Sequence, residues 1–466
     1  MFMGGMGGMR KIFFALMLMV AGLAKAQLPN KLTTADKIYG LSKFWQEVNY
    51  NFVYLDKVNR KQWDSAYKAM ITQVAATTND YTYFRLMQRF CALLNDGHTN
   101  VYMPDYIGAL QFTRMFGDYW LNLENINGKA IVTRTLKANL KELPIGTEVI
   151  EVNGIPVDSY LKDSVMPYIA SSTEYVKYDF AVNDLLKGLI GDSYRVKFKR
   201  PDGTIFPVTL THARTKDTAF YPAMPQHDLL ELKWYANDIA YVALNGFGNR
   251  KIDTMFVQKL PELYKAKAVI IDLRNNGGGS TSVGTDILQY FTNDTVLQHS
   301  RYSTREHLAS FKAWGLAVEP KDTLKSDWNR KAWKYYHDKG VYYFEYEPRP
   351  INITAQRIVV PTVLLFGHNT ASAAEDFLIS ADNQKHMVKM GTRSFGSTGQ
   401  PFEFGLPGGA SARVCTKKDT YPDGREFVGY GVAPDIEVIP DVADFIANRD
   451  KVLETAISYL QKKLTK

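Results

Sequence analysis

The stretch that decides the fold is PTVLLFGHNTASAAEDFLISAD, residues 361–382. Residues 363–366 form a short continuous apolar run, which is typical of a buried strand. Gly367, His368 and Asn369 end that run, and from Thr370 the apolar residues recur at helical spacing. Ser372 therefore stands where a strand ends and a helix begins. There its hydroxyl can be exposed while the first amides of the helix point toward it, which suits a nucleophile; a simple helix N-cap is the alternative.

A second stretch, KAVIIDLRNNGGGS at residues 267–280, supports the catalytic interpretation. Residues 268–273 again predict a buried strand, and three glycines follow it. Consecutive glycines allow positive φ angles and present backbone amides to a ligand. A flexible loop is the alternative. The position of the glycines between a buried strand and a helical stretch at residues 283–291 favours a functional edge of an α/β sheet.

Three motifs resemble one known family. They are IDLRNNGGG (271–279), NTASAAEDF (369–377) and GYGVAPDIEV (429–438). In this order they resemble the C-terminal-processing (tail-specific) serine peptidases, which include the tricorn protease core. The resemblance extends from about residue 34 to residue 438. It implies a serine-type peptidase that works through an acyl-enzyme, with Ser372 as nucleophile and the amides of Gly277 or Gly278 and of Ala373 holding the oxyanion. It implies no metal and no organic cofactor.

The resemblance also bears on the general base. Many members of the family use a lysine from a Gly-x-x-x-x-Gly-Lys segment, but the matching segment GTRSFGSTGQ (391–400) has Ser397 in its place. Lys385 and Lys389 lie nearby, and nothing in the sequence marks either as a buried base. LNDGHTNV (94–101) resembles the histidine segment of the tricorn-like branch. We therefore predict His98 as the base, because imidazole titrates in the working range of a general base. A turn histidine bonded to backbone is the alternative.

A histidine base normally needs a carboxylate that fixes its tautomer. The tricorn-like branch takes a glutamate from just before the Gly-x-Gly-Val-x-Pro-Asp motif, where this chain has Val428. Glu426 lies two residues earlier, on the same side of a regular strand, and is the predicted third member. The alternatives that remain open are Asp96, Glu375 and Asp423.

The sequence predicts a multidomain α+β protein. Residues 27–105 have the pattern of three helices, residues 110–215 are β-rich, residues 225–445 alternate strands with helices, and residues 446–466 predict a C-terminal helix. The hairpin signal around Asn153-Gly154, within LPIGTEVIEVNGIPVDSYL (143–161), resembles the core of a PDZ domain. An aromatic-rich insertion at about 298–352 suits either a substrate groove or lid, or a small helical subdomain.

The N-terminal residues predict where the protein is located. Residues 9–26, MRKIFFALMLMVAGLAKA, have a basic start, an apolar stretch too short to span a bilayer, and an A-x-A site. We expect residues 1–26 to be a cleaved signal peptide and the mature protein to be periplasmic or extracellular, with no stable membrane span. Cys91 and Cys415 are the two cysteines of the chain, and their pairing stays open.

The charge of the chain and its distribution bear on which partners the protein binds. The 466 residues carry a net charge of +8, but the basic residues are scattered, which does not favour nucleic-acid binding. The expected partner is a peptide or unfolded-protein substrate, with the oligomeric state open. Two other functions remain: a catalytically inactive peptide-binding or scaffold member of the same fold, and an esterase or a binder of apolar ligands that uses the same serine.

Overall fold

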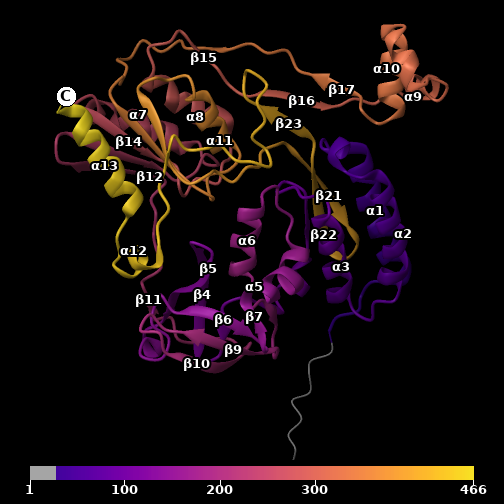
Figure 1. The fold of residues 1–466 in the computed structure, drawn as a ribbon, viewed down its shortest axis with the longest axis horizontal. Coiled ribbons are helices and arrows are strands. Elements are labelled where there is room, and N and C mark those ends of the chain that lie inside the picture. The colour runs from indigo at the N-terminus through magenta and orange to yellow at the C-terminus, as the bar shows by residue number, and fades with distance from the viewer. Residues whose placement is uncertain (1–27, 466) are drawn as a thin grey trace, which may run out of the picture.

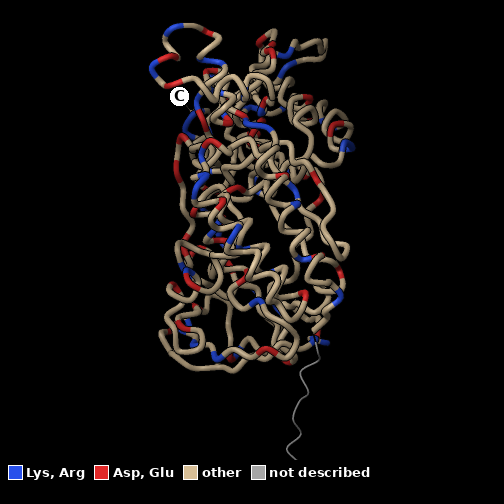
Figure 2. Tube along the Cα trace, turned by 90° about the vertical axis from the view of Figure 1, so that its right-hand side faces the viewer, with Lys and Arg blue, Asp and Glu red and all other residues tan. Residues whose placement is uncertain are grey.

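The computed structural model describes residues 28–465 and shows a mixed α+β protein. The predicted signal peptide lies outside the described residues. An α/β part with a central sheet occupies the top of Figure 1, a β-rich part the bottom, and three N-terminal helices the right-hand side. Basic and acidic residues are interspersed along the chain (Figure 2). Within residues 28–465, no helix combines the length and apolar character needed to cross a bilayer.

A six-stranded sheet forms the centre of the α/β part. Its strand order is β12-β13-β14-β19-β20-β24, and all neighbours are parallel except the edge pair β12–β13. Because parallel strands end at the same edge, the loops that follow β14 and β19 lie side by side. The strands are β12 (Leu230–Tyr235), β13 (Ile239–Leu244), β14 (Ala268–Asp272), β19 (Thr362–Phe366), β20 (Met387–Gly391) and β24 (Ile436–Glu437).

Both faces of this sheet are covered, which explains why its inner strands read as continuous apolar runs. Alternate residues such as Ile271 and Leu364 pack with helices α7 (Lys251–Leu263), α8 (Thr281–Leu288) and α11 (Ala373–Ser380) on one face. Their neighbours, such as Ile270 and Val363, pack on the other face against α13 (Lys451–Leu464).

The N-terminal part of the described chain forms three helices, α1 (Thr34–Asn51), α2 (Arg60–Ala75) and α3 (Asp80–Ala92). They share one continuous hydrophobic core with the α/β part. The strand that follows them, β1 (Asn100–Tyr102), pairs with β22 (Ala410–Cys415), which in turn pairs with β21 (Pro401–Leu406). This small sheet joins the first hundred residues to the last seventy or so.

The β-rich part has a hydrophobic core of its own. The predicted hairpin is present, with Asn153 in the left-handed region at φ 54°. The helix α6 (Glu174–Asn183) packs on β4 and faces the α/β part (Figure 1). The main strands are β4 (Tyr119–Ile126), β5 (Lys129–Leu136), β6 (Glu148–Val152), β9 (Ser193–Lys199) and β10 (Ile205–Thr211).

The aromatic-rich insertion forms an arm with a small helical unit at its tip. Strands β16 (Arg301–Arg305) and β17 (Val341–Tyr343) lead to helices α9 (Ala309–Gly315) and α10 (Asp327–Tyr336), which project at the upper right of Figure 1. The rings of Phe311 and Trp328 lie 4.7 Å apart between the two helices. The insertion is therefore a helical unit with its own aromatic contacts.

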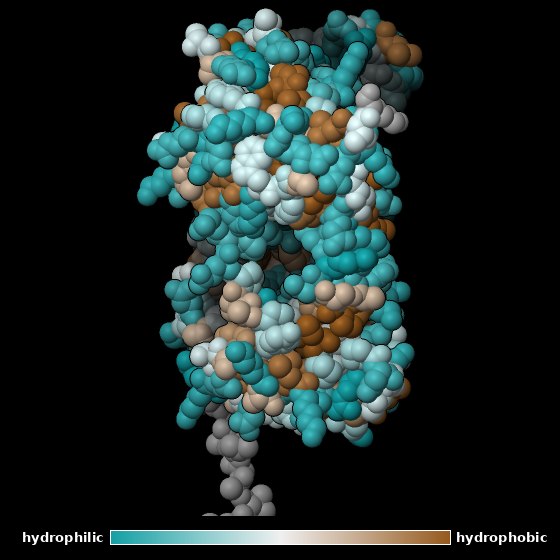
Figure 3. Space-filling model, turned by 90° about the vertical axis from the view of Figure 1, so that its left-hand side faces the viewer, coloured by the Kyte–Doolittle hydropathy of each residue, from teal (hydrophilic) through white to brown (hydrophobic). Residues whose placement is uncertain are grey.

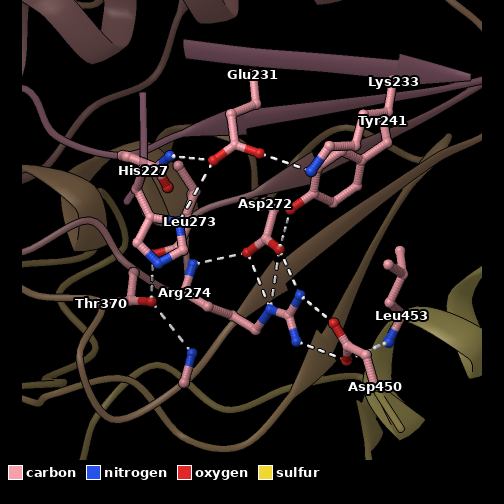
Figure 4. A network of polar contacts seen from close by, with 12 residues as sticks. His227, Glu231, Lys233, Tyr241, Asp272, Leu273, Arg274, Thr370, Asp450 and Leu453 are labelled. Atoms are coloured by element: carbon pink, nitrogen blue, oxygen red, sulfur yellow. Dashed lines mark hydrogen bonds and ion pairs between the residues drawn. The ribbon is translucent and has the colours of Figure 1, made fainter. Parts of the chain in front are cut away.

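A cluster of charged residues, here called the ionic brace, connects the end of β14 to the start of α13 (Figure 4). The guanidinium of Arg274, just after β14, donates to Asp272 at 2.6 Å and to Asp450 at the start of α13 at 2.8 Å. Tyr241 also donates to Asp272 at 2.9 Å. Asp272 is buried, so its carboxylate oxygens depend on these donors for hydrogen bonds. The brace ties the C-terminal helix to the strand that carries the glycine loop.

We expect Arg274→Ala to lower the free energy of unfolding by about 3 kcal/mol, because it leaves a buried carboxylate without its cation. Denaturant unfolding measures this. Arg330→Ala is a matched control, since Arg330 pairs with an Asp327 side chain that is 90% exposed, and it should change stability by less than about 1 kcal/mol. Equal effects of the two substitutions would contradict the brace.

Candidate active site

Ser372 occupies a strained turn between β19 and α11. Its backbone has φ 55° and ψ −123°, in a region that residues other than glycine rarely adopt. It is also the only residue of the stretch 370–381 that is not buried. Thr370 holds the turn in place, because its hydroxyl donates to the carbonyl of Leu273 at 2.9 Å and accepts the amide of Gly367 at 3.1 Å. A strained, accessible serine on a rigid turn is the geometry of a nucleophile.

The glycine loop packs directly against this turn. A Cβ added at Gly278 would lie 2.8 Å from the Cβ of Ser372, and Gly278 has φ 98°, so only glycine fits there. The amide of Gly278 donates to Asn276 Oδ1 at 2.9 Å, which occupies one of the three predicted oxyanion donors. Among the described residues, no acceptor is found for the amides of Gly277 and Ala373. These two amides remain as donors for an oxyanion.

Ser397 links His98 to the turn that carries Ser372. The Nδ1 of His98 is 2.7 Å from Ser397 Oγ, and the carbonyl of Ser397 accepts the amide of Ser372 at 3.3 Å. Burial, with smaller effects of the charges of Arg413 and Lys417, lowers the pKa of His98 to about 4. The imidazole is therefore neutral at ordinary pH, the form that a general base requires.

Glu426 does not take the place predicted for it. Its carboxylate bonds Lys57 at 3.1 Å and also Lys418, and none of its hydrogen bonds goes to His98. The prediction assumed a regular strand, but residues 424–428 are irregular, so the rule of alternating sides does not apply. Asp423, one of the alternatives, is exposed and pairs with Arg425.

Asp96, another alternative, is buried two residues before His98. It accepts hydrogen bonds from Thr99 Oγ1 at 2.7 Å and from Ser172 Oγ at 3.2 Å. Its carboxylate therefore fixes the turn that carries His98, while the ring of His98 is bonded to Ser397. Burial raises the pKa of Asp96.

Glu375, the remaining alternative, lies under the nucleophile turn and accepts four hydrogen bonds. One oxygen takes the amides of Ser372 at 3.1 Å and Ser397 at 3.3 Å. The other takes Ser394 Oγ at 2.5 Å and the amide of Gly396 at 2.7 Å. Burial raises the pKa of Glu375 to about 8, and the hydrogen bonds from Ser394, Gly396 and Ser372 act in the opposite direction. The sequence carried a signal for part of this network: Ser372 and Glu375 have the spacing of a capping box.

Neither of the two lysines near Ser372 in sequence, Lys385 and Lys389, forms a hydrogen bond with Ser372 within the described residues. Lys389 forms an ion pair with Asp382, and Lys385 is exposed. In the part of the chain that the structure describes, no cluster of His, Cys, Asp and Glu has the arrangement of a metal site. Cys91 and Cys415 are both buried and unpaired with each other.

A cleft of about 880 Å³ opens between the α/β part and the β-rich part, beside the nucleophile turn. The face shown in Figure 3 is hollowed between these two parts. Asn275 and His368, from the glycine loop and the nucleophile turn, line the cleft on one side, and Tyr175 and Asp179 of α6 line it on the other. His368 Nδ1 is 2.6 Å from Asp179 Oδ2, so the two parts are in direct contact there.

Comparison with known proteins agrees with this geometry. Residues 238–438 match the model of peptidase family S41. These residues form an S41 peptidase domain. The resemblance to the C-terminal-processing peptidases is thereby confirmed, and the enzyme is of the serine type. The match includes Ser372 and the glycine loop, whereas His98 lies outside it.

Two relatives extend the likeness along the chain. A carboxyl-terminal-processing protease of Picosynechococcus sp. is 21% identical over 91% of this chain and 88% of its own length. The chloroplastic C-terminal processing peptidase of Tetradesmus obliquus is 22% identical over 90% of this chain and 80% of its own. The crystal structure of mature CPAF has the same fold, with a TM-score of 0.65, 14% identity, and coverage of 88% of this chain and 94% of that one.

Proposed function

We propose that this S41 peptidase cleaves peptide bonds with Ser372 as nucleophile and His98 as general base. The observation that carries this proposal is the strained Ser372 turn, with His98 held beside it through Ser397. Ser372 Oγ attacks the carbonyl carbon while His98 takes its proton. The imidazolium then protonates the leaving amine, and a water molecule hydrolyses the acyl-enzyme by the reverse sequence.

The oxyanion of each tetrahedral intermediate is held by the amides of Gly277 and Ala373. Both are free of other acceptors among the described residues, and Ala373 is the first residue of α11, where the helix dipole also favours negative charge. Gly278 contributes by shape, because a side chain there would collide with the nucleophile turn.

The substrate in this proposal is an extended peptide or an unfolded segment of a protein. It enters the cleft beside His368, where the β-rich part faces the nucleophile turn. We assign residues 110–215 as a PDZ-like domain that presents the substrate by strand addition. The enzyme acts after export, as residues 9–26 predict.

A fluorophosphonate probe tests the chemistry, because it reacts with an activated serine and needs no knowledge of the substrate. We expect the folded protein to be labelled at Ser372, as located by mass spectrometry of the digest, and the heat-unfolded protein to remain unlabelled. A folded protein without label would instead support an inactive peptide-binding member of the family. Labelling with turnover of acyl esters but of no peptide would favour an esterase.

A further inference from the structure

Two segments that are separated by α11 and β20 meet at the site. The nucleophile turn carries Ser372, and the loop at residues 394–397 carries Ser397, which bonds His98. Glu375 accepts hydrogen bonds from both segments: from Ser372 on one, and from Ser394, Gly396 and Ser397 on the other. Its side chain is fully buried, so these contacts are not shared with solvent.

Ser397 faces both catalytic residues. Its side chain bonds the imidazole of His98, and its carbonyl accepts the amide of Ser372. If Nδ1 of His98 carries the proton and donates to Ser397 Oγ, then Nε2 has the free lone pair that a base requires. Ser397 then does for the tautomer of His98 what a carboxylate does in other serine hydrolases. It occupies the position at which many relatives have a lysine.

We propose that Glu375 and Ser397 are positioning residues of the peptidase: Glu375 locks the nucleophile turn to the 394–397 loop, and Ser397 orients the imidazole of His98. This inference rests on the proposed function. Neither residue reacts with the substrate. Each acts on Ser372 or His98 through hydrogen bonds, so their loss should lower the rate of the chemical step more than it weakens substrate binding.

Glu375→Gln is the first test. An amide has one acceptor oxygen, so whichever way it turns, at least one backbone amide among Ser372, Gly396 and Ser397 faces an NH₂ group. We expect kcat and the rate of fluorophosphonate labelling to fall about a hundredfold, because displacements of about 1 Å have effects of that size, with KM within about threefold.

The neighbouring carboxylate provides a matched control. Asp376 is also buried and accepts two hydroxyl hydrogen bonds, from Thr281 at 2.6 Å and Ser300 at 2.8 Å, neither of which belongs to the nucleophile turn or the 394–397 loop. Asp376→Asn should keep kcat and labelling within about threefold of the wild type. A comparable loss in both variants would show a general effect of altering a buried carboxylate and would overturn the assignment of Glu375.

Ser397→Ala is the second variant, and it tests the role of Ser397 even if Glu375→Gln fails to fold. It removes one buried hydroxyl and leaves the backbone contacts of the loop in place. We expect a fall of about a hundredfold in kcat. The double variant should also lose about a hundredfold, rather than the product of the two single losses, because both residues act through the same arrangement.

The outcomes separate this inference from the proposed function. A wild-type protein that neither labels nor cleaves peptides overturns both. A wild-type protein that labels at Ser372, with Ser397→Ala reacting at the wild-type rate, overturns the positioning role alone. Losses that multiply in the double variant would show that the two residues act separately and would overturn the shared lock.

Discussion

Ser372→Ala is expected to abolish peptide cleavage while the fold remains intact. In the proposed mechanism the hydroxyl of Ser372 is the attacking group, and the loss of a catalytic serine costs several orders of magnitude in kcat, since only the oxyanion donors and substrate binding remain. Cleavage of an unfolded protein substrate, measured with circular dichroism as a check on folding, tests this. More than about a hundredth of the wild-type rate would exclude Ser372 as the nucleophile.

The same helix offers a control for Ser372→Ala. The hydroxyl of Ser380, at the other end of α11, is buried and has no hydrogen-bond partner in the described structure. Ser380→Ala therefore removes a serine hydroxyl from α11 without removing a hydrogen bond, and this variant should retain full activity. Its stability should be unchanged or slightly higher, because an unpaired buried polar group is lost.

His98→Gln is expected to lower the maximal rate by roughly two to four orders of magnitude and to change the pH profile. In the wild type, the acid limb of kcat/KM should lie near pH 4 rather than near 6.5, because burial lowers the pKa of His98 and the rate rises as the imidazole loses its proton. In His98→Gln this limb should vanish. The profile of kcat/KM from pH 3 to pH 9 measures both effects.

His386 provides the matched control for His98→Gln. It is partly buried, bonds the carbonyl of Phe291 through Nε2 at 2.9 Å, and lies just before β20, at the edge of the sheet opposite the nucleophile turn. His386→Gln should keep both the rate and the acid limb. An acid limb that persists in His98→Gln would remove His98 from the mechanism and redirect attention to His368 in the cleft.

Local sequence patterns were sufficient for the elements around the nucleophile. The apolar runs before the glycine loop and before Ser372 form β14 and β19. Both strands are buried on two faces, so nearly every position in them requires an apolar residue. The turn at Ser372 was also predictable, since breakers and helical spacing are local signals. What no pattern revealed was the strain at Ser372, with its positive φ.

The partners of the catalytic residues were harder to predict, because they come from distant parts of the chain. His98 and Ser397 are 299 residues apart in sequence, and they lie together where β1 pairs with β22. The prediction of Glu426 depends on a regular strand, but the backbone there is irregular. Glu375 was considered as a partner of the histidine, whereas its contacts are with the backbone that holds the site.

The pairing of β1 with β22 also bears on how this enzyme can be divided. The domain recognised by its family runs from residue 238 to residue 438 and contains Ser372. His98, the proposed base, instead lies just before β1, the strand that follows the N-terminal helices, and those helices share their core with the same domain. A fragment limited to the recognisable domain would lack His98 and would leave β22 without β1, which exposes an unpaired, aggregation-prone strand edge. If His98 is the base, as proposed, the smallest active unit includes the N-terminal helices, and exchange of the recognisable domain alone would not transfer the activity.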